Sequence, residues 1–290
     1  MYKIIERTKL WFAISIIIIL IGVGFMASRG LNWSIDFKGG TIVSINMDKA
    51  FDKSEADIIV KKYANDATSV TLNNTVIEIK SAELTTEKVN TMFKELKEKY
   101  KLKDSGPVSQ RTIEASLGTH TKNNAILSII VANILILLYI GWRFEFKFGL
   151  SAIVALVHDV LITLSVYAIF QIPVDTAFIA AILTVLGYSM SDTIVVFDRV
   201  RENQKFMRSA NVAELANASI TQTFRRSIFT VLTVVITLTS VFVFVPAIRN
   251  FSIPLLVGII SGCYSSIFIA TPVWVILKNR IGKKVVVKKI

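Results

Sequence analysis

Six long apolar runs constrain the fold of this chain more than any other feature of its sequence. The chain has 290 residues, and 53% of them are hydrophobic. That composition is too apolar for an ordinary soluble domain, and a helix needs roughly 20 mostly apolar residues to cross a bilayer. The sequence therefore predicts six membrane-spanning helices, over residues 10–28, 124–141, 149–170, 176–197, 227–245 and 251–277.

Basic residues lie on one side of these predicted spans. Lysines and arginines precede the first run, separate the second from the third and the fourth from the fifth, and follow the sixth. The opposite loops, 171–174 and 246–250, carry only Arg249. Positively charged loops stay in the cytoplasm, so both termini are expected to be cytoplasmic and multi-pass insertion is expected in a plasma membrane. The net charge of +12 is then a topology signal, and nucleic acid is not an expected partner.

These patterns divide the chain into four parts. Residues 1–28 form a cytoplasmic N-terminus with the first helix, and 29–122 form an extracytoplasmic domain. Residues 123–277 contain helices two to six, and 278–290 form a basic cytoplasmic tail. The first apolar run lacks an A-x-A-like cleavage site after it, and it is too long for a signal-peptide core, so a retained span is expected.

The polar segment 29–122 has the pattern of a small α+β domain. Ser54 is a candidate N-cap for the first of its two helices, and an Asn-Asn turn at 73–74 joins two strands into a hairpin. The expected order is strand 41–47, helix 52–66, strands 69–72 and 75–80, and helix 85–101. This order suggests a ferredoxin-like domain. The charged residues on its helices are predicted to be a solvated face.

The stretch WSIDFKGGT, residues 33–41, joins the first span to this domain. Asp36 and Lys38 flank Phe37, and Gly39 and Gly40 permit positive φ angles and a tight turn. Two interpretations are open. The segment is either a hinge between helix and strand, which the sequence favours, or a junction that transmits motion between the membrane and the outer domain.

Ionisable residues inside the spans are the strongest functional signal. Span three contains His158 and Asp159, and span four contains Asp192 about 10 Å inside its cytoplasmic end. An ionised side chain at the centre of a span costs about 2.5–3.5 kcal/mol, so such residues face a bundle interior, form pairs, or carry protons or ions. Asp192 is predicted to be functional, while His158 and Asp159 are either functional or a structural pair.

Small and hydroxyl-bearing residues form rows beside these groups. Gly258 and Gly262 form a GxxxG-type face on span six, and Thr230 and Thr233 continue to Thr237 and Ser240 on span five, with Arg226 one turn before them. Span four carries a face suited to close helix packing, made of Ala177, Ala180, Ala181, Thr184, Gly187, Tyr188 and Ser191. Asp192, Arg226 and the hydroxyls are predicted to form one buried polar track. The alternative for the hydroxyls is bonding to carbonyls of their own helix.

The chemistry that these residues offer is ion exchange and not enzymatic catalysis. A carboxyl group balanced between burial and a nearby arginine can exchange a proton near neutral pH. The sequence has no Walker A lysine loop, no nucleophile–base pair, no cofactor fingerprint, and only two histidines and one cysteine. No cofactor is expected, and the energy would come from an ion gradient. A carboxylate with hydroxyls could use protons or sodium.

Four motifs in order resemble one known family. GYSMSDTIVVFDRVREN at 187–203, HD at 158–159, IDFKGG at 35–40 and FRRS at 224–227 resemble the SecF family, the smaller subunits of the SecD–SecF complex of bacterial protein export. The resemblance covers the whole chain. In that family an asparagine usually precedes the span-four aspartate, whereas this chain has Ser191, which leaves the fine hydrogen-bond geometry open.

This resemblance implies a function and partners. It implies half of a pseudo-symmetric assembly related to resistance-nodulation-division transporters, with SecD as the other half. The complex would use the proton gradient to draw unfolded secretory polypeptide across the membrane, with the SecYEG channel and the SecA motor. Asp192 and Arg226 match the family's proton route, and the outer domain is expected to move. The alternatives are a proton-driven small-molecule exporter and a non-catalytic scaffold of the translocon.

Overall fold

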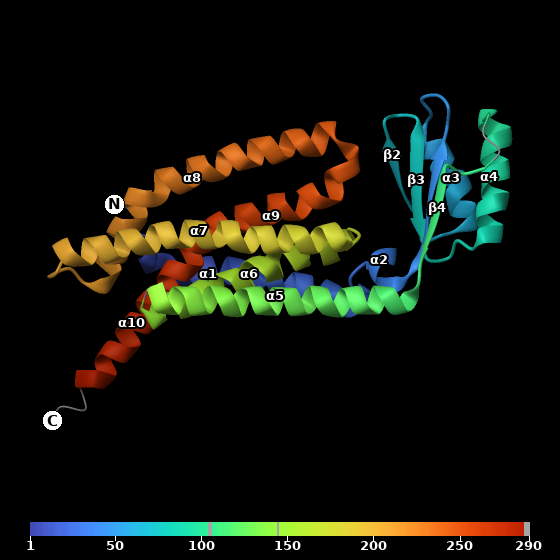
Figure 1. Ribbon diagram of the computed structural model, residues 1–290. Helices are drawn as coiled ribbons and strands as arrows, with labels where there is room; N and C mark the ends of the chain where they lie inside the picture. The colour runs from blue at the N-terminus through green and yellow to red at the C-terminus, as the bar shows by residue number, and fades with distance from the viewer. Residues whose placement is uncertain (104–105, 144, 287–290) are drawn as a thin grey trace.

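The computed structural model is a bundle of long helices with a small α/β domain at one end (Figure 1). It describes residues 1–103, 106–143 and 145–286. Six helical segments there are long and apolar enough to cross a membrane, as predicted. They comprise α1 (Thr8–Arg29, after the 3-10 turn Ile5–Arg7), α5 (Ala115–Arg143), α6 (Phe146–Phe170), α7 (Thr176–Phe206), α8 (Val212–Phe244) and the composite η2 (Pro246–Ile248), α9 (Arg249–Ser265), η3 (Ser266–Ala270) and α10 (Thr271–Val286).

Several helices extend beyond the predicted apolar runs. The helix α8 begins at Val212, where Asn211 and Glu214 form a capping box, and α5 begins at Ala115. Hydropathy detects only the stretch of a helix that lies within the hydrocarbon core, so the polar first turns of α5 and α8 were not predicted. The start of α1 and the end of α10 lie at the end of the bundle opposite the outer domain (Figure 1). The predicted basic tail 278–290 begins within α10, and residues 287–290 lie outside the described residues.

The outer domain has the element order β-α-β-β-α-β. Its elements are β1 (Gly40–Asn46), α3 (Lys53–Tyr63), β2 (Thr68–Leu72), β3 (Val76–Ser81), α4 (Thr86–Tyr100) and β4 (Ser109–Ile113). The sheet has the order β2-β3-β1-β4, and every pair is antiparallel. The two helices cover one face, where alternate strand residues such as Val43, Ile45, Ile77 and Ile79 form the core with Leu96.

Of three details of this domain, the structure confirms one prediction, contradicts another and adds a strand that was not predicted. The Asn73-Asn74 turn is present, with both residues at positive φ, as a tight hairpin requires. The N-cap of α3 is Asp52, whose side chain accepts from the Ser54 amide at 2.8 Å, so the prediction of Ser54 as the cap was wrong. The strand β4 was not predicted because its residues are mostly exposed at a sheet edge and therefore show no apolar alternation.

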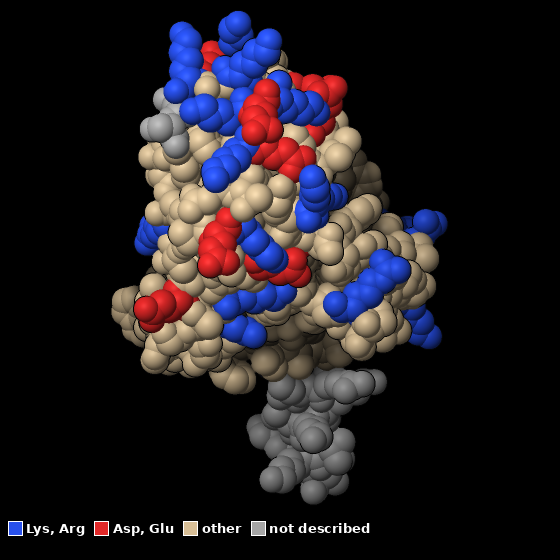
Figure 2. Space-filling model, turned by 90° about the vertical axis from the view of Figure 1, so that its right-hand side faces the viewer, with Lys and Arg blue, Asp and Glu red and all other residues tan. Residues whose placement is uncertain are grey.

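The outer face of this domain is charged but largely neutralised. Seen end-on, basic and acidic side chains gather most densely at the top of the view and are scattered among uncharged residues elsewhere (Figure 2). Ion pairs connect Lys62 with Glu95 and Lys99 with Glu55, both at 3.0 Å, across α3 and α4. All four side chains are substantially exposed, which is the solvated face that the sequence predicts.

The junction after α1 is held against the bundle at several points. It contains the short helix α2 (Ile35–Lys38), followed by Gly39 at φ +81° and Gly40 at φ +149°. A Cβ on Gly39 would lie 2.7 Å from the Ala115 nitrogen at the start of α5, so only glycine fits there. Asp36 Oδ2 accepts from the Thr176 amide at 3.1 Å, which connects this junction to the first turn of α7.

The helices α7 and α9 pack closely through glycine. A Cβ on Gly258 would clash with Val185, and one on Gly262 would lie 2.9 Å from Ser189 Cβ. The predicted GxxxG-type face on span six therefore meets α7. The sixth span is interrupted after Ser265 by the π-helical turn η3, in which Thr271 Oγ1 donates to the Ser266 carbonyl at 3.0 Å. Hydropathy predicts a continuous span here, because a π turn does not change composition.

Candidate functional site

The ionisable residues of the spans lie in two neighbouring places. One is the Asp192 pocket, lined by Tyr188, Ser189, Ser191, Asp192, Thr230, Val231, Val234, Ile259 and Cys263. The other is the Asp159 cluster, made of Ser15, His158, Asp159, Ser189, Ser261 and Ser265. Ser189 belongs to both.

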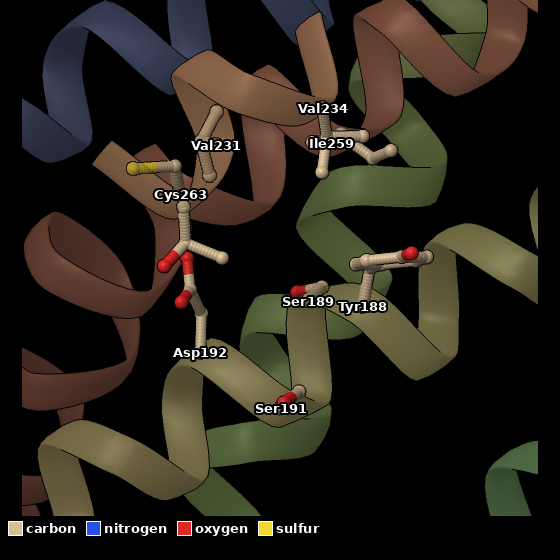
Figure 3. A pocket seen from close by; sticks show the side chains of 9 residues that line it. Tyr188, Ser189, Ser191, Asp192, Val231, Val234, Ile259 and Cys263 are labelled. Atoms are coloured by element: carbon tan, nitrogen blue, oxygen red, sulfur yellow. The ribbon is translucent and has the colours of Figure 1, made fainter. Parts of the chain in front are cut away.

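The Asp192 pocket lies where α7, α8 and α9 meet. Its volume is about 80 Å³, which accommodates several water molecules, since each needs roughly 10–15 Å³. Figure 3 shows Tyr188, Ser189, Ser191 and Asp192 along one stretch of α7, with Val231 and Val234 from α8 and Ile259 and Cys263 from α9. Asp192 is half-buried, so its carboxyl group borders both protein and open space.

Two residues of α8 act on the Asp192 carboxyl group. Arg226 is near enough to interact with its charge, and the Ser227 hydroxyl lies beside it. Ser227 is buried, and its hydroxyl has no partner within hydrogen-bonding distance in the part of the chain that the structure describes. Arg226 itself is exposed at the side of the bundle. The structure thus places Arg226 near Asp192, but no ion pair joins them among the described residues, and the exposed Arg226 is not part of a buried track. Ser227, which follows Arg226 directly, is a neighbour of the carboxyl group that the sequence analysis missed.

Of the predicted row of hydroxyls on α8, only the first residue lies at the Asp192 pocket. Thr230 lines the Asp192 pocket. Thr233 donates to the Thr230 carbonyl at 2.8 Å, Thr237 to Thr233 at 3.0 Å, and Ser240 to Ile236 at 3.0 Å. These three bond within their own helix and are exposed, as in the alternative interpretation of the sequence. Only the end of the row nearest Arg226 therefore contributes to the pocket.

The predicted packing face of α7 is open in this chain. Ala181 is buried, but Ala180, Thr184, Gly187, Tyr188 and Ser191 are exposed. A Cβ on Gly187 would meet no atom within 4 Å among the described residues. Within the described residues, α9 packs on the neighbouring face of α7, through Val185 and Ser189, and the small-residue face itself has no helix packed closely on it. Small and polar side chains beside Asp192 thus remain uncovered.

Asp159 is the most completely hydrogen-bonded charged group of the bundle among the described residues. Its side chain is fully buried. Oδ2 accepts from Ser189 at 2.6 Å and from Ser265 at 2.8 Å, while Oδ1 accepts from Ser261 at 2.7 Å and contacts His158 Nδ1 at 3.0 Å. Four partners on α6, α7 and α9 match the lone-pair capacity of one carboxylate.

His158 extends this cluster to α1. Its Nε2 lies 2.9 Å from Ser15 Oγ, and its ring stacks on Tyr264 of α9 at 5.9 Å between centroids. The Tyr264 hydroxyl donates to the Trp11 carbonyl at 2.8 Å. Ser261 and Ser265 are four residues apart and so share one face of α9, which is visible in the sequence. Their pairing with Asp159 was not visible because nothing local indicates which helices are neighbours.

The described residues contain no group of three or more histidine, cysteine, aspartate and glutamate side chains that could hold a metal ion. The single cysteine, Cys263, is buried in the wall of the Asp192 pocket and is free.

Two family models match the chain. Residues 88–280 match "Protein export membrane protein SecD/SecF, C-terminal", and residues 24–50 match the "SecD/SecF GG Motif", which covers the α2 junction. The chain is 36% identical over 287 residues to the protein translocase subunit SecF of Sebaldella termitidis, covering 96% of this chain and 92% of that one. It is 35% identical to SecF of Alicyclobacillus acidocaldarius, covering 98% and 95%.

Some relatives are longer than this chain. The chain is 36% identical to the protein translocase subunit SecDF of Bacillus subtilis, of which it covers 38%. Its fold is similar to the crystal structure of SecDF, a translocon-associated membrane protein from Thermus thermophilus, with a TM-score of 0.79 and 31% identity. That match covers 96% of this chain and 39% of the other. The chain thus corresponds to less than half of these fused proteins.

Proposed function

The chain belongs to the SecD/SecF family of protein-export membrane proteins, and on that premise we propose that it couples the proton gradient to polypeptide export as a SecF-type subunit of the Sec translocase. It is a multi-pass membrane protein, and its relatives are translocase subunits. The observation that carries the proposal is the Asp192 pocket, whose wall contains a half-buried carboxyl group and four hydroxyl-bearing residues, with Arg226 near enough to act on the carboxyl group. Such a carboxyl group can be loaded and unloaded with a proton.

The partner would be SecD. Relatives exist in which a SecF-like part occupies about two-fifths of a fused SecDF chain. The open face of α7 supports the same partner, because polar side chains and Asp192 border it and lipid cannot satisfy them. A second bundle on this face would close the pocket from the side. Unfolded secretory polypeptide, the SecYEG channel and SecA are the further proposed partners.

The proposal includes an orientation in the membrane and a fold for the outer domain. We place both termini in the cytoplasm, because the basic loops lie at the end of the bundle where α1 starts and α10 ends. The outer domain is then extracytoplasmic. We assign it a ferredoxin-like fold, which its element order and the strand order β2-β3-β1-β4 support. The contact between Asp36 and Thr176 gives motion of this domain a route to α7.

The experiment is export into inverted membrane vesicles with Asp192→Asn, with proton and sodium gradients imposed separately. We expect the variant to lose the stimulation that the proton gradient gives, while SecD still assembles. Asp198→Asn is the matched control, because Asp198 lies on the same helix, is exposed, and pairs with Arg201. If Asp192→Asn keeps the stimulation, the chain is a scaffold. If the variant changes drug tolerance in cells and leaves secretion intact, the chain is an exporter. If only a sodium gradient stimulates the wild-type chain, the coupling ion is sodium.

A further inference from the structure

Ser189 is a neighbour of both Asp159 and Asp192. It lines the Asp192 pocket, one helical turn before Asp192 on α7, and its hydroxyl donates to Asp159 Oδ2 at 2.6 Å. The pocket has room for water, and the residues in its wall include both Asp192 and Ser189. Asp159 is fully buried and does not line this pocket, so Ser189 is its contact with the wall of that space.

Asp159 is arranged to accept a proton without losing its partners. With four donors around it, the carboxylate serves only as an acceptor. On protonation one of its oxygens becomes a donor, so one neighbouring hydroxyl must turn to another acceptor. Ser265 has that acceptor in place, since its Oγ also lies 3.2 Å from the Gly262 carbonyl. The protonated Oδ2 could then donate to Ser265 Oγ while Ser265 donates to Gly262.

We propose that Asp159 is a second proton-accepting site, reached from Asp192 through Ser189. In this step the Asp192 O–H bond breaks and its proton passes to a pocket water, which releases one of its own protons to Ser189 Oγ. Ser189 transfers its hydroxyl proton to Asp159 Oδ2, where a new O–H bond forms. Asp192 ends ionised and Asp159 neutral, so one proton has moved and the total charge is unchanged.

The groups around Asp159 suit this role. On its own helix, His158 contacts Oδ1 and also Ser15 on α1, so the imidazole holds the cluster to a fourth helix. From α9 the other titratable group is Tyr264, stacked on His158, and from α7 it is Asp192, beyond Ser189. The inference rests on the proposed function, because it takes Asp192 as the site that receives the proton from outside.

The test compares proton uptake by proteoliposomes that contain the chain assembled with SecD, under an imposed pH gradient. We expect Ser189→Ala to lower the proton flux per assembled complex at least tenfold. Ser252→Ala is the matched control, because Ser252 is equally buried and bonds to the Ile248 carbonyl of its own helix. The control should retain the flux. Wild-type flux in Ser189→Ala would overturn the relay.

A second measurement separates the relay from a structural role of Asp159. Infrared difference spectra of the complex, recorded on acidification, should contain a protonated-carboxyl band that disappears in Asp159→Asn and persists in Asp192→Asn. The absence of such a band from the wild-type complex would overturn the inference. This measurement does not need Ser189→Ala, so it remains decisive if that variant fails to assemble. Flux that survives Asp192→Asn would instead refute the proposed function, whereas flux lost in Asp192→Asn but kept in Ser189→Ala would refute the relay alone.

Discussion

Asp159 and Asp192 are two carboxylates of one helix bundle with opposite surroundings. Asp159 is fully buried and receives four hydrogen-bonding contacts from three helices. Asp192 is half-buried and lines a pocket with room for several water molecules, with hydroxyl-bearing side chains and one exposed arginine near it. Both are costly in a membrane, and the chain compensates them differently.

This difference shows two ways in which the bundle accommodates a carboxylate. A buried carboxylate whose lone pairs are all satisfied stabilises the arrangement of the helices that satisfy it. A carboxylate that borders water and has few fixed partners can change its protonation without breaking the packing around it. The comparison therefore predicts that Asp159 contributes more to stability and that Asp192 contributes more to coupling, with Ser189 as their physical link.

The largest expected effect is on stability. Asp159→Ala leaves the Ser189 and Ser261 hydroxyls without their acceptor in the bundle interior and removes the contacts of Ser265 and His158 with the carboxylate, which should lower the free energy of unfolding by about 3–5 kcal/mol. Asp192→Ala should lower it by less than about 1 kcal/mol. Unfolding of the purified chain in detergent measures both. Equal losses would remove the distinction between the two carboxylates.

A smaller effect is expected at the contact that brings the two sites together. Gly262→Ala would force α9 away from Ser189, since the added Cβ would lie 2.9 Å from Ser189 Cβ, and should cost about 1–3 kcal/mol. Gly24→Ala on α1 is the control, because its Cβ would meet no described atom within 4 Å, and it should be neutral or stabilising by up to about 1 kcal/mol. The same unfolding assay compares them, and indistinguishable variants would mean that α7 and α9 are not tightly packed.

The smallest effect concerns a third carboxylate, Glu95, which lies in water. It accepts from Tyr63 at 2.5 Å and from Lys62 at 3.0 Å, and these two hydrogen bonds lower the pKa of Glu95. Because the pKa is lower in the folded state, the stabilisation is complete above the ordinary pKa of a glutamate and disappears as the pH falls through the lowered value. Glu95→Gln should therefore speed hydrogen exchange of the α3 and α4 amides about twofold at pH 7.

The matched comparison for Glu95 is the same exchange measurement in acid. Below the lowered pKa both the wild-type chain and Glu95→Gln carry a neutral side chain at this position, so their exchange rates should coincide. A difference that persists in acid would assign the effect to packing and not to charge.

Much of the outer domain and the site could be predicted from residue patterns. The two helices and three of the four strands follow from local periodicity, and Asp175 caps α7 through the Phe178 amide at 3.0 Å. Asp192, Arg226 and Thr230 share one side of their helices with small or polar neighbours, so their association was predictable. The polar edge strand β4 was not, because its stability comes from pairing with β1 and not from its own residues.

The sequence by itself determined six spans, a small α+β domain and a carboxyl group that lipid alone cannot satisfy, because hydropathy and periodicity are properties of neighbouring residues. Only the tertiary structure decided which serines surround Asp159 and which face of α7 stays open. Ser265 lies 106 positions from Asp159 and Ser189 lies 30 positions away, so no local pattern can pair them. The rotation and order of packed helices set those contacts, and they depend on the fit of whole helix faces.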